Sequence, residues 1–289
     1  MDDRNLHHWR EQARGQGMSE AEVDQWLALA RPHLTLYRAQ TDPAAAPAVG
    51  TPGAADKPAA GTPVVGYRGG RPSLPPDLEW SGESDFVAAV DCAALPPDLP
   101  GFPLPADGHL LFFHFDHGQQ PSFVGGDGWV TYIPAGTATT ERADSTDMYD
   151  EAVRRGIEPE RFPLQCWRHW DPPNLECHGE YGSPDRFIEH MPEGFMDTLR
   201  ALEDPRPAYA RDNEIMELGG YCKTESDACA SAEHTDPSHR KWRLLASIVR
   251  DVYDGQEGVP HLVHWIIRED DLAARNFEDV QTHTACLWA

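Results

Sequence analysis

A run of apolar residues near the middle of the chain carries the clearest structural signal. Residues 110–113 are Leu-Leu-Phe-Phe, and the sequence turns polar on both sides, at Asp107-Gly108 before the run and from His114 onward after it. A short apolar run with a turn signal at each end is typical of a strand that is covered on both faces. The pattern therefore predicts a central strand over residues 109–116.

Other segments share this strand-like pattern, and they lie at residues 86–91, 129–133, 163–170, 242–249, 261–268 and 280–288. The segment 129–133 follows a glycine-rich turn at residues 125–128, which predicts a hairpin with the central strand. The fold class that follows is α+β with mainly antiparallel β-sheets.

Two pairs of predicted strands resemble each other in pattern and order. Residues 86–91 and 109–116 form the first pair, and residues 244–251 and 261–268 form the second. One interpretation is an internal duplication, and the other is chance similarity between short segments, because the two spacers differ in length.

The amino-terminal residues predict a helical arm over residues 1–40. Ser19 and Glu22 have the spacing of a capping box, and apolar side chains then recur on one helical face until Pro32 interrupts the pattern. This face is expected to pack on the main domain, with docking to a partner as the alternative. Residues 41–63 are almost entirely Ala, Pro, Gly and Thr, which predicts a flexible linker. The main domain then covers residues 64–289.

Helices are also predicted at residues 148–155 and 195–203, within irregular loops rich in Pro and Gly. The segment from residue 222 to residue 239 predicts a polar loop, and residues 270–277 predict a short helix. These elements would cover the sheet.

The charge of the chain restricts its partners. There are 48 acidic and 24 basic residues, which give a formal net charge of -24. Without a basic patch, nucleic acid and anionic membranes are unfavourable partners. The acidic surplus serves either solubility or the attraction of a basic partner protein or a cation. No oligomeric state is predicted.

The cysteines and the amino terminus favour a cytoplasmic protein. The six cysteines are even in number, but the sequence begins Met1-Asp2-Asp3 without a secretory signal, so six reduced thiols are expected. No apolar run approaches the roughly 20 residues of a membrane span.

Polar residues at the end of the central strand form the first candidate site. His114 and Asp116 share one face of a strand and His117 points to the other, while Asp127 could approach from the facing hairpin. These four residues predict either a metal or acid–base site, or a solvated strand end.

A second candidate site is a set of four zinc-type ligands, Cys222, Cys229, His234 and His239. The six-residue gap between the cysteines is too long for a zinc knuckle, so a polar surface loop is the favoured interpretation. Cys166, His169, Cys177 and His178 form a looser cluster. No nucleophile elbow or P-loop is present, so no metal and no cofactor is expected.

Several loop-and-strand motifs resemble the YwqG-like family of uncharacterised bacterial proteins. The resemblance covers residues 64–289 and rests on Gly69-Gly70-x-Pro72-x-Leu74-Pro75 with Trp80, on residues 86–91, on Gly108-x-Leu110-x-Phe112-Phe113-x-x-Asp116, on Gly219-Gly220-Tyr221, on Trp242-x-Leu244-Leu245, and on Trp265-x-Ile267 with Asp271-Leu272 and Phe277. It implies a compact α+β domain with antiparallel sheets and related halves. It implies no activity, although some such families occur among bacterial immunity proteins.

Two functional hypotheses follow. The first is a non-enzymatic binding protein whose acidic surface engages a basic partner, as an immunity protein would. The second is a metal-dependent hydrolase that uses His114, Asp116 and Asp127. The loop after Tyr221 and the amino-terminal arm depart from the family pattern, so a function located there cannot be carried over from the family.

Overall fold

The computed structural model describes residues 4–39, 62–80, 84–97, 99–114, 128–142, 161–171, 214–222, 228–252 and 259–286. The helices are α1 (Arg4–Gly15), α2 (Glu20–Leu27), α6 (Ala228–Thr235) and α7 (Glu269–Ala274). The main strands are β1 (Arg31–Arg38), β2 (Gly66–Arg68), β4 (Asp85–Asp91), β5 (His109–His114), β6 (Gly128–Ile133), β8 (Phe162–Asp171), β9 (Glu214–Gly219), β10 (Trp242–Val252), β11 (Val259–Arg268) and β12 (Gln281–Cys286). Two short strands, β3 (Ser73–Leu74) and β7 (Thr140–Glu141), form a separate pair.

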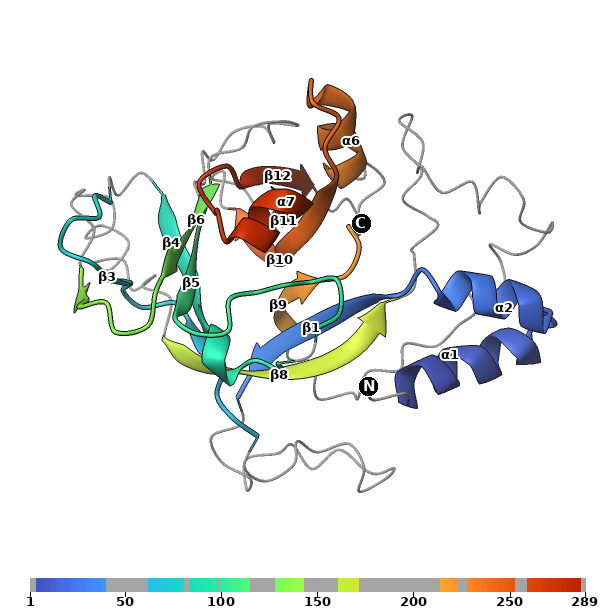
Figure 1. Cartoon of the computed structure of the whole chain (residues 1–289). Coiled ribbons are helices and arrows are strands. Elements are labelled where there is room, and N and C mark those ends of the chain that lie inside the picture. The colour runs from blue at the N-terminus through green and yellow to red at the C-terminus, as the bar shows by residue number, and fades with distance from the viewer. Residues whose placement is uncertain are drawn as a thin grey trace.

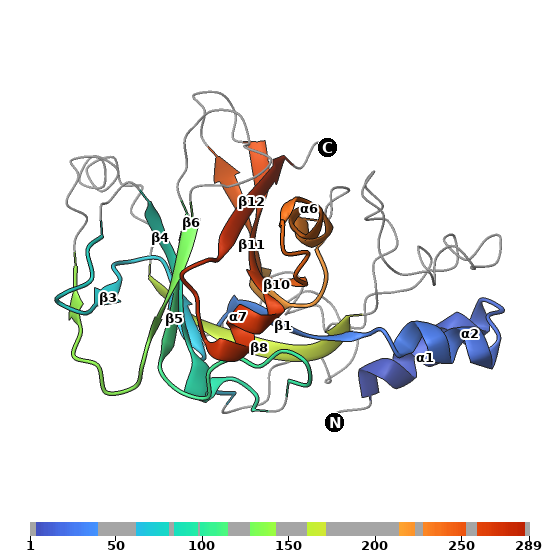
Figure 2. The ribbon, with the colours of Figure 1, turned by 45° about the horizontal axis from the view of Figure 1, so that its top comes forward.

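One antiparallel sheet of ten strands organises the molecule (Figure 1). Its order is β12-β11-β10-β9-β1-β8-β2-β4-β5-β6, so each end is a three-stranded meander. The sheet curls until its two edge strands, β6 and β12, lie side by side (Figure 2). Mostly antiparallel β-structure with few helices is thus confirmed, and the sheet is close to a barrel.

The closure of the sheet depends on Thr282 and Gly128. The Gly128 amide donates to the Thr282 hydroxyl oxygen at 2.8 Å, and that hydroxyl donates to the Gly128 carbonyl at 3.1 Å. A Cβ atom at Gly128 would lie 2.7 Å from the Phe113 carbonyl oxygen and 2.8 Å from the Thr282 Cγ2. Glycine therefore allows the two edges of the sheet to approach each other closely.

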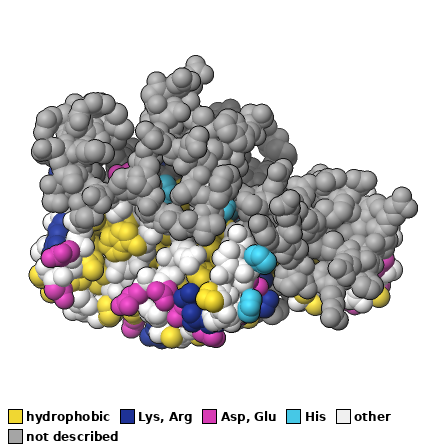
Figure 3. Space-filling view, turned by 90° about the horizontal axis from the view of Figure 1, so that it is seen from above, with side chains coloured by type: hydrophobic (Ala, Val, Ile, Leu, Met, Phe, Trp, Pro, Cys, Tyr) yellow, Lys and Arg dark blue, Asp and Glu magenta, His cyan; other side chains and the backbone are white. Residues whose placement is uncertain are grey.

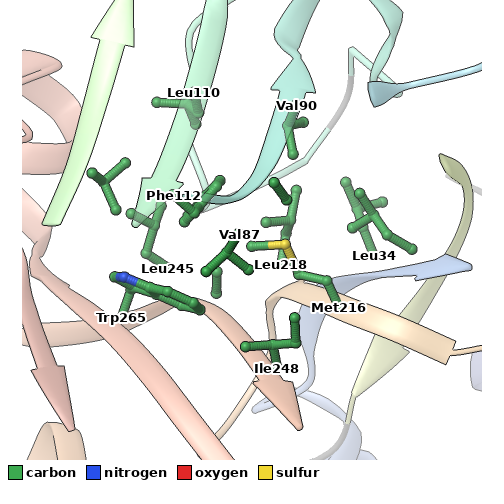
Figure 4. Close-up of a cluster of buried hydrophobic side chains, with 14 of the residues drawn as sticks. Leu34, Val87, Val90, Leu110, Phe112, Met216, Leu218, Leu245, Ile248 and Trp265 are labelled. Atoms are coloured by element: carbon green, nitrogen blue, oxygen red, sulfur yellow. The ribbon is translucent and has the colours of Figure 1, made fainter. Parts of the chain in front are cut away.

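The main core lies inside the curl, where the two meanders meet (Figure 4). Phe112 from β5 and Trp265 from β11 pack edge to face, with their ring centroids 5.4 Å apart and the planes at 71°. The Trp265 indole nitrogen also donates to the Phe113 carbonyl at 3.1 Å. This pair joins the two ends of the sheet through its interior.

A β-bulge occurs at the same place in both meanders. The register of β4 on β5 shifts at Val87, and that of β10 on β11 shifts at Leu245. Each extra residue turns toward the main core together with the alanine after it. The bulges explain why both segments are continuously apolar in sequence, since each strand also buries residues on its outer face.

Two smaller apolar clusters cover parts of the outer face. Phe86, Leu111 and Phe113 pack under Leu74 and Trp80 at the β4–β5–β6 end. At the other end, α6 packs on β10 and β11, where its small side chains meet residues of both strands; this cluster comprises Cys222, Ala228, Cys229, Ala232, Trp242, Leu244 and Ile266. The prediction of a polar loop over residues 222–239 is wrong where α6 forms, because Ala228, Cys229 and Ala232 give this segment a buried helical face.

The amino-terminal prediction is correct only in part. Ser19 and Glu22 form the predicted capping box at the start of α2. The helical arm ends at Leu27, however, and β1 then enters the middle of the sheet between β8 and β9. Leu34 and Leu36 face the core while Thr35 between them faces outward, which is the period of a strand. The Trp9 indole of α1 donates to the Trp170 carbonyl at 3.3 Å, which fixes the helices to β8.

The other predicted strands are found as β4, β6, β8, β10, β11 and β12. The strand predicted at residues 109–116 is β5, which is buried on both faces but lies next to the edge strand rather than at the centre of the sheet. Residues 115–116, most of the predicted linker, and the helices predicted at residues 148–155 and 195–203 lie outside the described residues. Among the helices that are described, none has the length and apolar character that a membrane crossing requires.

Asp236, just after α6, joins the helix to the ends of two strands. Its carboxylate accepts hydrogen bonds from the Ser238 amide at 2.9 Å and hydroxyl at 2.5 Å, from the Arg268 Nε at 2.9 Å and from the Trp242 indole at 3.3 Å. The Ser238 hydroxyl and amide, followed by the Arg268 guanidinium, hold the pKa of Asp236 well below its ordinary value.

Replacing Asp236 with asparagine is expected to lower the melting temperature by several degrees at pH 7. Because the folded-state pKa is depressed, the stabilisation is complete above the unfolded pKa of about 4 and is lost as the pH falls toward the folded value. The difference in melting temperature between wild type and Asp236→Asn should therefore shrink between pH 7 and about pH 3, as measured by circular dichroism. Asp77→Asn, at an exposed loop position, is the control. A difference independent of pH would contradict this assignment.

Candidate functional site

A row of buried polar side chains crosses the outer face of the sheet from β8 to β12. We name it the polar row, and it consists of His169, His33, Thr35, Glu217, Ser247, His264 and His283. Strand register aligns these residues, because Thr35 pairs with Glu217, Glu217 with Ser247, Ser247 with His264, and His264 with His283. Their exposed fractions range from 0% to 6%, so the row is as buried as the core.

The period of the strands explains why these residues share a face. In β9, Met216 and Leu218 point into the main core, so Glu217 between them points to the opposite face. In β11, Val263 and Trp265 flank His264 in the same way. Each strand therefore contributes its polar residue opposite the core.

Glu217 is the only carboxylate of the row. Its Oε1 lies 3.2 Å from the His33 Nε2, which is an ion pair when His33 is protonated. Its Oε2 accepts a hydrogen bond from the Ser247 hydroxyl at 3.1 Å. A buried carboxylate is tolerated only when it is paired and hydrogen-bonded, and these two neighbours provide both interactions.

Imidazole rings lie at both ends of the polar row. His33 and His169 have ring centroids 4.3 Å apart, and the His169 Nε2 shares a hydrogen bond of 3.1 Å with the Thr35 hydroxyl. On the other side, His264 and His283 lie roughly parallel, with centroids 6.4 Å apart. The row therefore places imidazole rings on both sides of Glu217.

The order of the groups limits the chemistry of the row. In a catalytic triad the histidine lies between the nucleophile and the carboxylate and accepts the proton of the nucleophile. Here Ser247 donates directly to Glu217, so its hydroxyl is not activated by an imidazole. Within the described ranges, no group of three or more His, Cys, Asp or Glu side chains has the arrangement to hold a metal ion. The row therefore lacks the serine–histidine–carboxylate order of a catalytic triad.

The site predicted at the end of the central strand is described only at His114. This residue is 4% exposed, and its Nε2 lies within hydrogen-bond distance, 3.3 Å, of the Thr284 hydroxyl on β12. Asp116, His117 and Asp127 lie outside the described residues. His114 therefore contributes to the contact between the two edges of the sheet.

The four predicted zinc ligands are not brought together as a metal site. Cys222 and Cys229 are buried with their sulfur atoms 3.5 Å apart, under α6. His234 and His239 do not join them in a group that could hold a metal ion. Cys229 and His234 both belong to α6, but Cys229 lies on the buried face of the helix and His234 does not, so the helix keeps them apart.

Cys92 and Cys166 are the other two cysteines whose side chains the structure describes. Cys166 faces the main core and His169 faces outward, because the two residues are an odd number apart on β8, so these two members of the looser cluster do not come together. Cys177 and His178 lie outside the described residues. Burial raises the pKa of Cys166 to about 11 and that of Cys92 to about 12, so both are protonated thiols at neutral pH.

Residues 68–286 match the model of a protein family described as "Domain of unknown function (DUF1963)". The chain belongs to this family. Comparison with curated proteins gives no match. The DUF1963 region runs from the end of β2 to β12 and supplies five members of the polar row, namely His169, Glu217, Ser247, His264 and His283. His33 and Thr35 come from β1, which lies outside the matched residues and yet in the middle of the sheet.

The polar row was not predicted from the sequence. Its signal is a single polar residue between two apolar ones in several strands, such as Glu217 in β9 and His264 in β11. Each position alone is typical of a solvated outer face. Only the pairing of strands that are distant in sequence places them in one row.

Proposed function

We propose that this DUF1963 protein is a non-enzymatic binding protein whose acidic surface engages a basic partner protein. The observation that carries the proposal is the ratio of 48 acidic to 24 basic residues. Charge of this size accelerates association with an oppositely charged protein and disfavours anionic partners. We include a cytoplasmic location and the absence of nucleic-acid binding in the proposal.

The described surface offers part of this charge. Asp270 and Glu278, at α7 and the turn after it, are exposed and form no ion pair with any residue in the described ranges. Elsewhere acidic and basic side chains are interspersed with hydrophobic ones, as one face shows (Figure 3). The larger part of the acidic surplus belongs to sequence outside the described ranges. The proposal therefore concerns the charge of the whole chain rather than one described patch.

The polar row gives no support to the hydrolase hypothesis. It is buried, and its serine donates to a carboxylate rather than to an imidazole, so the Ser–His–carboxylate order of a catalytic triad is not present in it. The hydrolase hypothesis needs His114, Asp116 and Asp127 together, and of these only His114 is described, where its neighbour is Thr284. No observation on the described residues favours the hydrolase, so we do not propose it.

The proposal extends to the origin of the fold. The equivalent bulges at Val87 and Leu245, and the matching meanders around them, support a duplicated half with β4 corresponding to β10 and β5 to β11. Membership of the YwqG-like group and an immunity-protein role, which the motif resemblance implies, fit a binding protein with an acidic surface. The pull-down experiments described next test the basic partner; they do not test the duplication or the family membership.

Pull-down experiments at low and high salt test the proposal. The immobilised protein should capture a small set of basic proteins from a lysate of its source cells at about 50 mM salt and lose them at about 500 mM, because exposed charges are screened beyond the Debye length. An unrelated bait of similar size and net charge is the control for unspecific attraction. The purified partner should then bind with a Kd that rises at least about tenfold over this salt range. Partners that are neutral, or that are retained equally at both salt concentrations, would refute the proposal.

A further inference from the structure

A hollow of about 320 Å³ lies where the end of α2 and the start of β1 meet two distant segments. Its lining includes Leu29, Arg31, Pro32, Gly101, Tyr221 and Arg243. The volume is at the lower end of the range for small-molecule sites. Two arginines in one small hollow are unexpected in a chain with half as many basic as acidic residues.

Arg31 lies in this hollow, and among the described residues it has no carboxylate partner. Its guanidinium carbon lies 4.1 Å from the centroid of the Tyr221 ring, which is a cation–π contact. The Tyr221 hydroxyl donates to the Leu29 carbonyl at 2.5 Å, which fixes the ring under the guanidinium. Within the described ranges, no acidic side chain lies within ion-pair distance of Arg31. A guanidinium that lies over an aromatic ring still has N–H groups that point away from the ring and can donate to a ligand.

Arg243 adds a second, oriented donor. Its Nε and Nη2 lie 3.1 Å and 2.5 Å from the Glu269 Oε1, so Glu269 occupies one edge of the guanidinium. The Nη1 is directed elsewhere, and it lies 4.0 Å from the point that a Cβ atom on Gly101 would occupy. Gly101 lines the hollow and has a φ of +72°, which favours glycine. The Nη1 amino group of Arg243 therefore lies at the wall of the hollow.

The net charge of the residues that line the hollow indicates which class of ligand fits. Glu269 neutralises Arg243, so the described residues leave the hollow with about one uncompensated positive charge, that of Arg31. The carbonyl end of α2 lies at the same hollow and disfavours additional negative charge. A monoanion fits this balance, whereas a dianionic phosphate exceeds it. Leu29, Pro32 and the neighbouring alanine and proline residues offer apolar walls for the rest of the ligand.

We propose that this hollow binds a small organic monocarboxylate with an apolar body, whose carboxylate is held by Arg31 and by the Nη1 of Arg243. This proposal does not rest on the proposed function. The net charge of the protein does not prevent such binding, because screening at physiological ionic strength reduces the effect of charges beyond about 8 Å. Close charge-assisted hydrogen bonds then determine the affinity.

Calorimetric titration with benzoate, benzyl alcohol and phenyl phosphate tests the site. Benzoate should bind the full-length protein with a Kd at least about tenfold lower than the Kd of either other compound, since a charge-assisted hydrogen bond accounts for about this factor. The variant Arg31→Gln should lose about tenfold or more in benzoate affinity. Arg38→Gln is the matched control, because Arg38 also lies on β1 and also packs on an aromatic ring, that of Phe162 at 4.6 Å, outside the hollow.

A second variant covers the case in which Arg31→Gln does not fold. Arg31→Lys keeps the positive charge but loses the planar fork, so its benzoate affinity should fall between wild type and the loss expected for glutamine. Far-ultraviolet circular dichroism of each variant confirms folding before titration. The proposal is overturned if wild type does not bind benzoate, if phenyl phosphate binds more tightly than benzoate, or if Arg31→Lys and Arg38→Gln change the affinity equally.

Discussion

Replacing Trp265 with alanine is expected to reduce the free energy of unfolding by about 3–5 kcal/mol. The side chain is fully buried between the two meanders, and its removal leaves a cavity beside Phe112. The Phe113 carbonyl would also lose its indole donor. Urea denaturation followed by circular dichroism measures the change.

Two further variants separate packing from hydrogen bonding at this position. Trp265→Phe keeps an aromatic ring next to Phe112 but removes the indole N–H, so a smaller loss of about 1–3 kcal/mol is expected from the unsatisfied carbonyl. Val249→Ala, at a side chain that is 48% exposed on β10, should change stability by less than about 0.5 kcal/mol. If Trp265→Ala destabilised the protein no more than Val249→Ala, the two meanders would not share a core.

Replacing Glu217 with alanine is expected to cost about 3–5 kcal/mol, because it removes one member of a buried, hydrogen-bonded pair. His33 and Ser247 would lose their contacts with the carboxylate in the interior of the polar row. The loss is measured as the shift of the urea midpoint at pH 7, with the slope of the transition checked for constancy.

An exposed ion pair provides the control for Glu217. Glu141 pairs with Arg161 at 2.7 Å, but both side chains are about half exposed, so Glu141→Ala should cost no more than about 1 kcal/mol. The double variant His33→Leu with Glu217→Met should recover most of the loss, because well-packed apolar residues often replace a buried ion pair without cost. Equal effects of Glu217→Ala and Glu141→Ala would show that the polar row is open to water.

Most strands could be predicted because their own residues determine them. The segment around Leu111 is apolar on both faces, and it forms a strand wherever its partners lie. The strand β1 was not predicted, because the capping box of α2 and the apolar residues after it suggested that the helix continues. The bulges at Val87 and Leu245 hide the alternation of their strands, because each places two successive residues on the core face.

The polar row could not be predicted because its order depends on strand pairing. Thr35 and Glu217 are neighbours only because β1 pairs with β9, and Ser247 joins them only through β10. Residues that were selected for their chemistry, such as Cys229 and His234, are close in sequence, but α6 places them in different environments. Spacing along the chain therefore indicated candidate ligands, whereas the pairing of distant strands determined which side chains meet.

The position of β1 has a consequence for how the chain folds during synthesis. Both strands that pair with it, β8 and β9, belong to the second half of the chain. The amino-terminal segment must therefore remain unpaired while most of the polypeptide is made, and contacts between such distant residues slow folding. Until β1 is inserted, β8 and β9 each present an open edge that can pair with another molecule. Nascent chains of this protein are for that reason an expected client of holding chaperones.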